Sequence, residues 1–164
     1  MGERRAEVER RIAAPPGAVY DLVSDVTRMG DWSPETSSCR WLGDATGPAV
    51  GARFVGSNRR GPLLWSTSCR VTAADRGREF AFAVTFAGLP ISDWRYTFVP
   101  DGDGCLVVET WHDRRGAAMR LGSVPVMGIA DRAAHNRRGM VVTLDALARA
   151  AEAAGPGRAG NAGA

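Results

Sequence analysis

The sequence predicts an α+β domain in which a curved antiparallel sheet wraps around a long C-terminal helix. Three observations predict this fold: a strand that runs into a proline-started helix, a series of strand-like segments after residue 38, and an amphipathic segment at about residues 128–152. A chain of 164 residues is long enough for one core and too short for two. We assign residues 1–154 to a single domain and expect the Gly/Ala-rich residues 155–164 to be disordered.

The first strand and the first helix are predicted from their spacing. Val8, Arg10 and Ile12 alternate along a strand and share one of its faces. Pro15 and Pro16 then start a helix, because a missing N–H costs nothing in the first turn. That helix carries an apolar stripe at helical spacing, formed by Val19, Leu22, Val23 and Val26. It breaks at the turn formed by residues 32–34.

The middle of the chain is predicted to consist of strands joined by turns. Their ranges are residues 38–42, about 52–59, 64–73, 80–86, 94–98 and 105–113. The clearest is 80–86, in which large and small residues alternate strictly. Turn residues separate the segments at 61–62, 75–77 and 100–104. With the first strand, the sheet has six to seven strands.

The final helix is predicted from an apolar stripe with one polar member. The stripe contains Ile129, Ala133, Met140, Leu144, Leu147 and Ala151, and Asn136 falls on the same face. A curved sheet with one amphipathic helix across its concave side does not fill its own middle. We therefore expect an internal hydrophobic cavity between them.

Short motifs spread over residues 5–152 are shared with a known superfamily. They are Ala14-Pro15-Pro16, Trp32-Ser33-Pro34, Gly51-Ala52-Arg53-Phe54, Gly56-Ser57-Asn58, Trp65, Gly77-Arg78-Glu79-Phe80, Trp94-Arg95-Tyr96 and the helix around Gly139-Met140. With them the chain resembles the START-like (SRPBCC) superfamily of polyketide cyclases/dehydratases, Bet v 1-type binding proteins and lipid carriers. The resemblance implies the helix-grip fold and a hydrophobic cavity, in a superfamily that contains both enzymes and carriers.

The amino-acid composition limits the chemistry and the kinds of partner that we expect for this protein. All 21 basic residues are arginine, so Schiff-base chemistry on a lysine is excluded. The net charge is only +3 and no nucleic-acid-binding motif accompanies the arginines, so we expect a solvated surface and no nucleic-acid partner. The chain shows neither a signal peptide nor a long apolar run, and its three cysteines are widely spaced. We expect a cytoplasmic protein that does not insert into membranes; a homodimer is left open.

Familiar catalytic machinery is missing from the sequence. There is no nucleophile elbow, zinc-binding helix or phosphate loop. The chain has only two histidines, His112 and His135, which provide few ligands for a metal ion. We therefore expect no metal site. His135 is interpreted as a surface partner of Asp131, four residues earlier on the final helix. We also expect no cofactor.

Polar residues on apolar faces are the candidate site. Arg10, Asn58, Glu109 and Asn136 each share a face with apolar neighbours. Burying such groups without a partner is unfavourable, so each needs a protein partner, a water or a ligand. The candidate ligand-binding residues are these four together with Trp32, Phe54, Trp65, Phe82, Trp94, Tyr96, Trp111 and Met140. Ordinary core packing is the alternative for each ring, and mutual hydrogen bonding is the alternative for the polar groups.

The expected partner is a hydrophobic, aromatic or polycyclic small molecule. A cofactor-free polyketide cyclase/dehydratase needs a shaped pocket and one acid or base, which Glu109 or a water held by Asn58 and Asn136 supplies. A buried Glu109 has a raised pKa, whereas an ion pair with Arg10 or Arg95 lowers it. The alternative function is a non-catalytic binding or transport protein for a lipid or other hydrophobic ligand.

Residues 116–128 connect the last strand to the final helix. Glycines and a proline interrupt an otherwise apolar segment there, which favours a hinged gate over the mouth of the pocket. An ordinary packed connection is the alternative.

Overall fold

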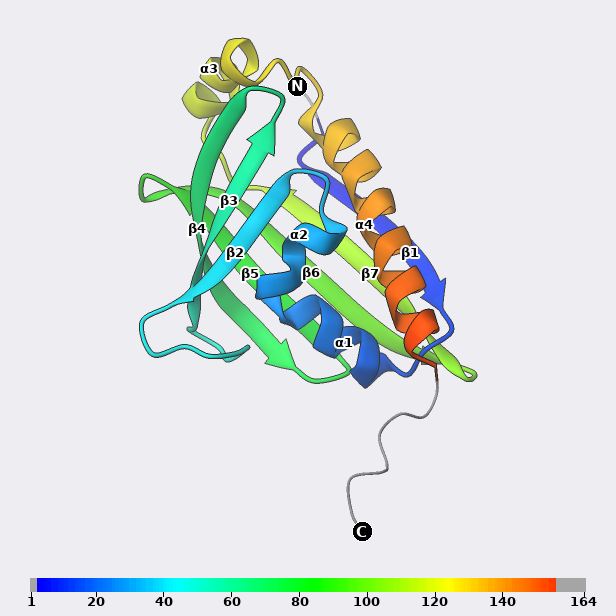
Figure 1. Cartoon of the computed structure of the whole chain (residues 1–164). Helices are drawn as coiled ribbons and strands as arrows, with labels where there is room; N and C mark the ends of the chain where they lie inside the picture. Colours follow the sequence, from blue (N-terminus) through cyan, green and yellow to red (C-terminus); the bar gives the residue numbers. More distant parts are fainter. Residues whose placement is uncertain (1–2, 156–164) are drawn as a thin grey trace.

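A seven-stranded antiparallel sheet forms the frame of the molecule, with the strand order β1-β7-β6-β5-β4-β3-β2 (Figure 1). The computed structural model describes residues 3–155, except for the side chains of residues 124–127. The strands are β1 (Arg5–Ile12), β2 (Thr36–Leu42), β3 (Arg53–Arg60), β4 (Leu63–Asp75), β5 (Glu79–Phe86), β6 (Leu89–Asp101) and β7 (Gly104–Asp113). The α+β prediction of a curved sheet with a C-terminal helix is confirmed.

Helices cover one side of this sheet. They are α1 (Pro16–Ser24), the 3-10 turn η1 (Val26–Arg28), α2 (Met29–Trp32), α3 (Ala117–Met127) and α4 (Arg132–Ala154). Figure 1 shows α4 running diagonally beside β1, with α1 and α2 in front of the middle of the sheet and α3 near the N-terminal end of α4. No helix among the described residues is long and apolar enough to cross a membrane.

The core lies where α1 and the C-terminal half of α4 meet the sheet. Tyr20 of α1 packs edge-on against Phe80 and Phe98, with ring centroids 6.2 and 5.8 Å apart. Leu144 and Leu147 of α4 are fully buried in the same cluster. Each such side chain contributes about 1.5–3 kcal/mol on burial. This apolar packing fills one end of the space under the sheet.

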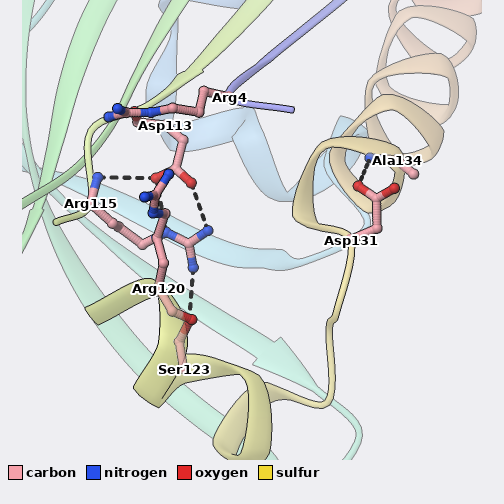
Figure 2. A network of polar contacts seen from close by, with 7 residues as sticks. All are labelled: Arg4, Asp113, Arg115, Arg120, Ser123, Asp131 and Ala134. Atoms are coloured by element: carbon pink, nitrogen blue, oxygen red, sulfur yellow. Dashed lines mark hydrogen bonds and ion pairs between the residues drawn. The ribbon is translucent and has the colours of Figure 1, made fainter. Parts of the chain in front are cut away.

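Three features of the last third of the chain differ from what the sequence predicts. Residues 116–128, predicted as a hinged gate or a packed connection, contain the helix α3, for which no helix was predicted. The final helix begins at Arg132, because Oδ1 of Asp131 accepts a 2.9 Å hydrogen bond from the backbone N of Ala134 and so caps the helix (Figure 2). The expected Asp131–His135 pair is wrong, because Nε2 of His135 lies 2.7 Å from Oε1 of Glu35. Of the predicted disordered tail, residues 155–164, Gly155 ends α4 and residues 156–164 lie outside the described residues.

Candidate functional site

A pocket of about 540 Å³ lies between the sheet and α4, at the end that the core does not fill. Such a volume suits a small organic molecule. Strands β3 to β7 supply most of the wall, α4 supplies the opposite side, and α2 and α3 contribute at the ends. Leu63, Leu64, Phe86 and Gly122 line the pocket and are exposed to solvent, so they mark its rim.

Aromatic side chains from neighbouring strands form the wall of the pocket. Trp94 of β6 is the cross-strand partner of both Phe82 of β5 and Trp111 of β7. Trp65 on β4 and Phe54 on β3 extend this surface. Cross-strand neighbours on one face of a sheet lie close together, so the rings form a continuous apolar surface.

All the predicted ligand-binding residues except Arg10 line this pocket. They are Trp32, Phe54, Asn58, Trp65, Phe82, Trp94, Tyr96, Glu109, Trp111, Asn136 and Met140. Strand alternation places most of them on one face, and the stripe of α4 supplies the last two. Their contact with a ligand stays a prediction.

Arg10 is placed wrongly by the sequence analysis. It lies on the edge strand β1 and forms an ion pair with Asp145 of α4, where its side chain is 42% exposed. Arg95 pairs with Glu79 and is also exposed. Helix α4 packs on β1, so the inward face of this edge strand meets the helix rather than the pocket. The alternative of an ion pair between Glu109 and either arginine is therefore wrong.

Glu109 is a buried carboxyl group whose environment is polar on one side only. The residue is 1% exposed, and the hydroxyl of Tyr96 donates a 2.7 Å hydrogen bond to its Oε1. Its Oε2 has no hydrogen-bond partner. Burial raises the pKa of Glu109 from 4.5 to about 8, although the hydrogen bond from Tyr96 lowers it. Burial, followed by the neighbouring Glu109, also raises the pKa of Tyr96 well above its ordinary value.

Two further buried donors in the pocket have no partner. They are Nε1 of Trp32 and Nδ2 of Asn136, in residues 7% and 6% exposed. With Oε2 of Glu109, they are the buried side-chain nitrogen and oxygen atoms without a hydrogen bond in the described part of the chain. Each unsatisfied group is unfavourable by about 1–3 kcal/mol. All three residues line the pocket, so the unsatisfied polar atoms gather where a ligand would lie.

Asn58, the second predicted catalytic residue, is satisfied within the protein. Its Nδ2 donates to Oγ1 of Thr67 at 3.2 Å and to the carbonyl of Gly56 at 3.4 Å. Its Oδ1 accepts from the hydroxyl of Thr36 at 3.2 Å. These contacts join β2, β3 and β4 and hold the Asn58 amide in one orientation beside the pocket.

A charged cluster at one end of the pocket was missed by the sequence analysis. Glu35 contacts both His135 and Arg132, the latter at 3.5 Å. Arg115, just after β7, forms an ion pair of 2.8 Å with Asp113 (Figure 2). Residues 132, 135 and 136 have the spacing of one helical face, but His135 was interpreted as a surface partner of Asp131, so this signal was not used.

An antiparallel sheet gripping a C-terminal helix, with a pocket between them, defines the class of helix-grip proteins. A family model described as "polyketide cyclase / dehydrase and lipid transport" matches residues 3–152. The chain therefore belongs to this family, which confirms the resemblance inferred from the sequence motifs. A search of the curated proteins finds no significant match.

Solved structures with the same fold include one clear relative. The Polyketide_cyc-like protein Cgl2372 from Corynebacterium glutamicum is 33% identical, with a TM-score of 0.65 and coverage of 94% of this chain and 95% of that one. DynU16, a putative protein in the dynemicin biosynthetic locus, is 14% identical with a TM-score of 0.60, and 90% of this chain covers 46% of it. The di-domain ARO/CYC StfQ from the steffimycin pathway is 10% identical with a TM-score of 0.66, and 92% of this chain covers 52% of it. The last two likenesses concern the fold alone.

Proposed function

We propose that the pocket encloses an aromatic or polycyclic small molecule and that the protein acts on it as a cofactor-free polyketide cyclase/dehydratase. The main support is one observation. Buried polar atoms of Glu109, Asn136 and Trp32 have no hydrogen-bond partner, and these residues line an otherwise aromatic pocket. A ligand with several oxygen atoms would satisfy them. Membership of the polyketide cyclase / dehydrase and lipid transport family supports this function.

The proposed reaction is an aldol cyclisation followed by loss of water. The enol carbon of a bound polyketone attacks a carbonyl carbon, and a carbon–carbon bond forms. Protonated Glu109 gives a proton to the carbonyl oxygen, and the enol hydroxyl returns one to the carboxylate, so the acid is regenerated. Elimination then releases water with a proton from the neighbouring carbon. No electron is gained or lost, so the chemistry needs no redox cofactor.

Glu109 is suited to this role because its pKa of about 8 lies near the working pH. The hydroxyl of Tyr96 holds Oε1 of Glu109 by a hydrogen bond. Oε2 of Glu109 has no partner, so it is the oxygen that would carry the proton and face the ligand. The free donors of Asn136 and Trp32 would hold carbonyl oxygens of the folded chain. We assign Asn58 a positioning role, because its amide already bonds within the sheet.

The first test is binding of an uncharged polycyclic probe such as anthraquinone. Trp65, Trp94 and Trp111 line the pocket, so binding should quench tryptophan emission, and it should also raise the melting temperature. Polycyclic and long-chain probes that change neither signal would contradict the pocket assignment. If a genuine ligand binds but never turns over, the carrier function replaces the enzymatic one.

A further inference from the structure

One end of the pocket differs from its aromatic wall. The first turns of α4 present Arg132, His135 and Asn136 to the pocket, and Glu35 and Arg115 line the same space. We call these five residues the polar end. None of the proposed chemistry uses the charges at this end.

Charged groups of both signs act on Arg132 at the polar end. Arg132 is attracted by Glu35 and Asp113 and is repelled by two other arginines, Arg60 and Arg115. The three guanidinium groups therefore face two carboxylates. Burial lowers the pKa of Arg132, and the charge of Glu35 opposes this effect.

The two arginines that line the polar end differ in how firmly they are held. Arg115 donates from Nε and Nη2 to the two carboxylate oxygens of Asp113, at 2.9 and 2.8 Å, and from Nη1 to Ser123 at 2.9 Å (Figure 2). Arg132 lies 3.5 Å from the nearest oxygen of Glu35, longer than an ordinary charge-assisted hydrogen bond. Oε1 of Glu35 is in turn engaged by His135. The guanidinium of Arg132 is therefore the one with donor capacity to spare.

We propose that the polar end binds a carboxylate, so that the natural ligand is an aromatic or polycyclic carboxylic acid held by Arg132 and Asn136. This inference rests on the proposed function, because it requires the ring system to occupy the pocket. Asn136 follows Arg132 by one helical turn, so both side chains lie on the same face of α4. Nδ2 of Asn136 is buried without a partner, and a guanidinium matches a planar carboxylate. The guanidinium of Arg115 already donates to Asp113 and Ser123, so it is not available as a second cation for a doubly charged phosphate.

Glu35 would compete with the carboxylate of a ligand for the guanidinium of Arg132. It is the carboxylate of the polar end itself, and its contact with Arg132 is loose. Glu35→Gln removes this competing charge, whereas Arg132→Gln removes the group that both carboxylates need. The two substitutions therefore change the affinity for an acid in opposite directions. Loss of structure alone would weaken binding in both variants.

The test is calorimetric titration with an anthracenecarboxylic acid, its methyl ester and the corresponding anthracenyl phosphate. In the unmodified protein we expect the acid to bind about tenfold or more tightly than the ester, as a charge-assisted hydrogen bond implies. Arg132→Gln should abolish this preference without changing the affinity for the ester. Glu35→Gln should strengthen binding of the acid several-fold. Arg138→Gln is the matched control, because Arg138 is exposed on α4, does not line the pocket and should not alter the preference.

Equal affinity for acid and ester in the unmodified protein would overturn the carboxylate site and leave the pocket function standing. Failure of all three compounds to bind would count against the pocket function itself. Tighter binding of the phosphate than of the acid would overturn the ligand class. The inference is also overturned if Arg132→Gln weakens acid and ester alike or if Glu35→Gln weakens the acid.

Discussion

The hydroxyl of Tyr96 donates a 2.7 Å hydrogen bond to Oε1 of Glu109, and Oε2 of the same carboxyl group has no partner. The two residues are cross-strand neighbours on β6 and β7. One oxygen is thus anchored within the sheet, and the other is available to a ligand. Because the group is uncharged over much of the neutral range, it can donate a proton without an ion pair to break.

Glu109→Gln is expected to lower turnover of the genuine substrate by about 10²- to 10⁴-fold. The amide keeps the shape of the side chain but has no proton to transfer, so ligand affinity should remain largely intact. Single-turnover rates and binding constants, measured per folded molecule, check this expectation. A fully active variant would remove Glu109 from the chemistry, and a variant that loses binding to the same extent as rate would indicate a positioning role.

Glu109 should also make stability depend on pH. Its pKa in the folded protein is about 8 and its ordinary value is 4.5, so the folded state holds a proton that the unfolded chain releases between these values. The free energy of unfolding therefore falls as pH rises through this interval, by at most about 1.4 kcal/mol per pH unit. The stabilisation that Glu109 contributes is fully present below pH 4.5 and is lost above about pH 8. Urea unfolding across this range should show a shallower decline for Glu109→Gln; parallel curves would contradict the raised pKa.

Asn136→Leu is expected to stabilise the ligand-free protein, because it removes a buried donor that has no partner. The same substitution should weaken binding of oxygen-bearing ligands and spare a plain hydrocarbon probe. Asn58→Leu is the matched control and should destabilise, because the amide of Asn58 bonds to Thr36, Thr67 and the Gly56 carbonyl. Thermal melting and probe titration measure both effects. Equal destabilisation by the two substitutions would show that Asn136 is satisfied in solution.

Helix α3 is expected to open more readily than α4. It carries pocket-lining Met119, Gly122 and Ser123 and has no extensive contact with another described helix or strand, whereas α4 packs on β1, α1 and α2. The 2.9 Å hydrogen bond from Arg115 to Ser123 links α3 to the end of β7 (Figure 2). Hydrogen exchange at residues 117–123 should therefore be faster than in α4, should slow when a ligand binds, and should accelerate in Ser123→Ala. Equal protection with and without ligand would contradict the gating role.

Sequence reasoning located most of the pocket wall because strand alternation is a local property. Phe82, Trp94 and Trp111 lie on inward faces that the period of two already identifies. The same alternation predicted wrongly that Arg10 lines the pocket. Arg10 is on an inward face, but its strand is at the edge of the sheet and packs against α4. Alternation along a strand determines which face of the sheet a side chain lies on. The element packed against that face determines whether the side chain meets a pocket, a helix or solvent.

Sequence patterns were enough to identify the fold, the inward faces of the strands and the apolar stripe of the last helix. These features follow from periodicities of two and 3.6 residues, which act over one segment at a time. The polar pairs, in contrast, follow from how the elements pack: Tyr96 with Glu109, His135 with Glu35, and Arg10 with Asp145. The last two pairs join residues 100 and 135 positions apart, so they depend on how separate elements pack and not on any local pattern. The same packing leaves Oε2 of Glu109 and Nδ2 of Asn136 without partners, and so places the polar atoms of the candidate site.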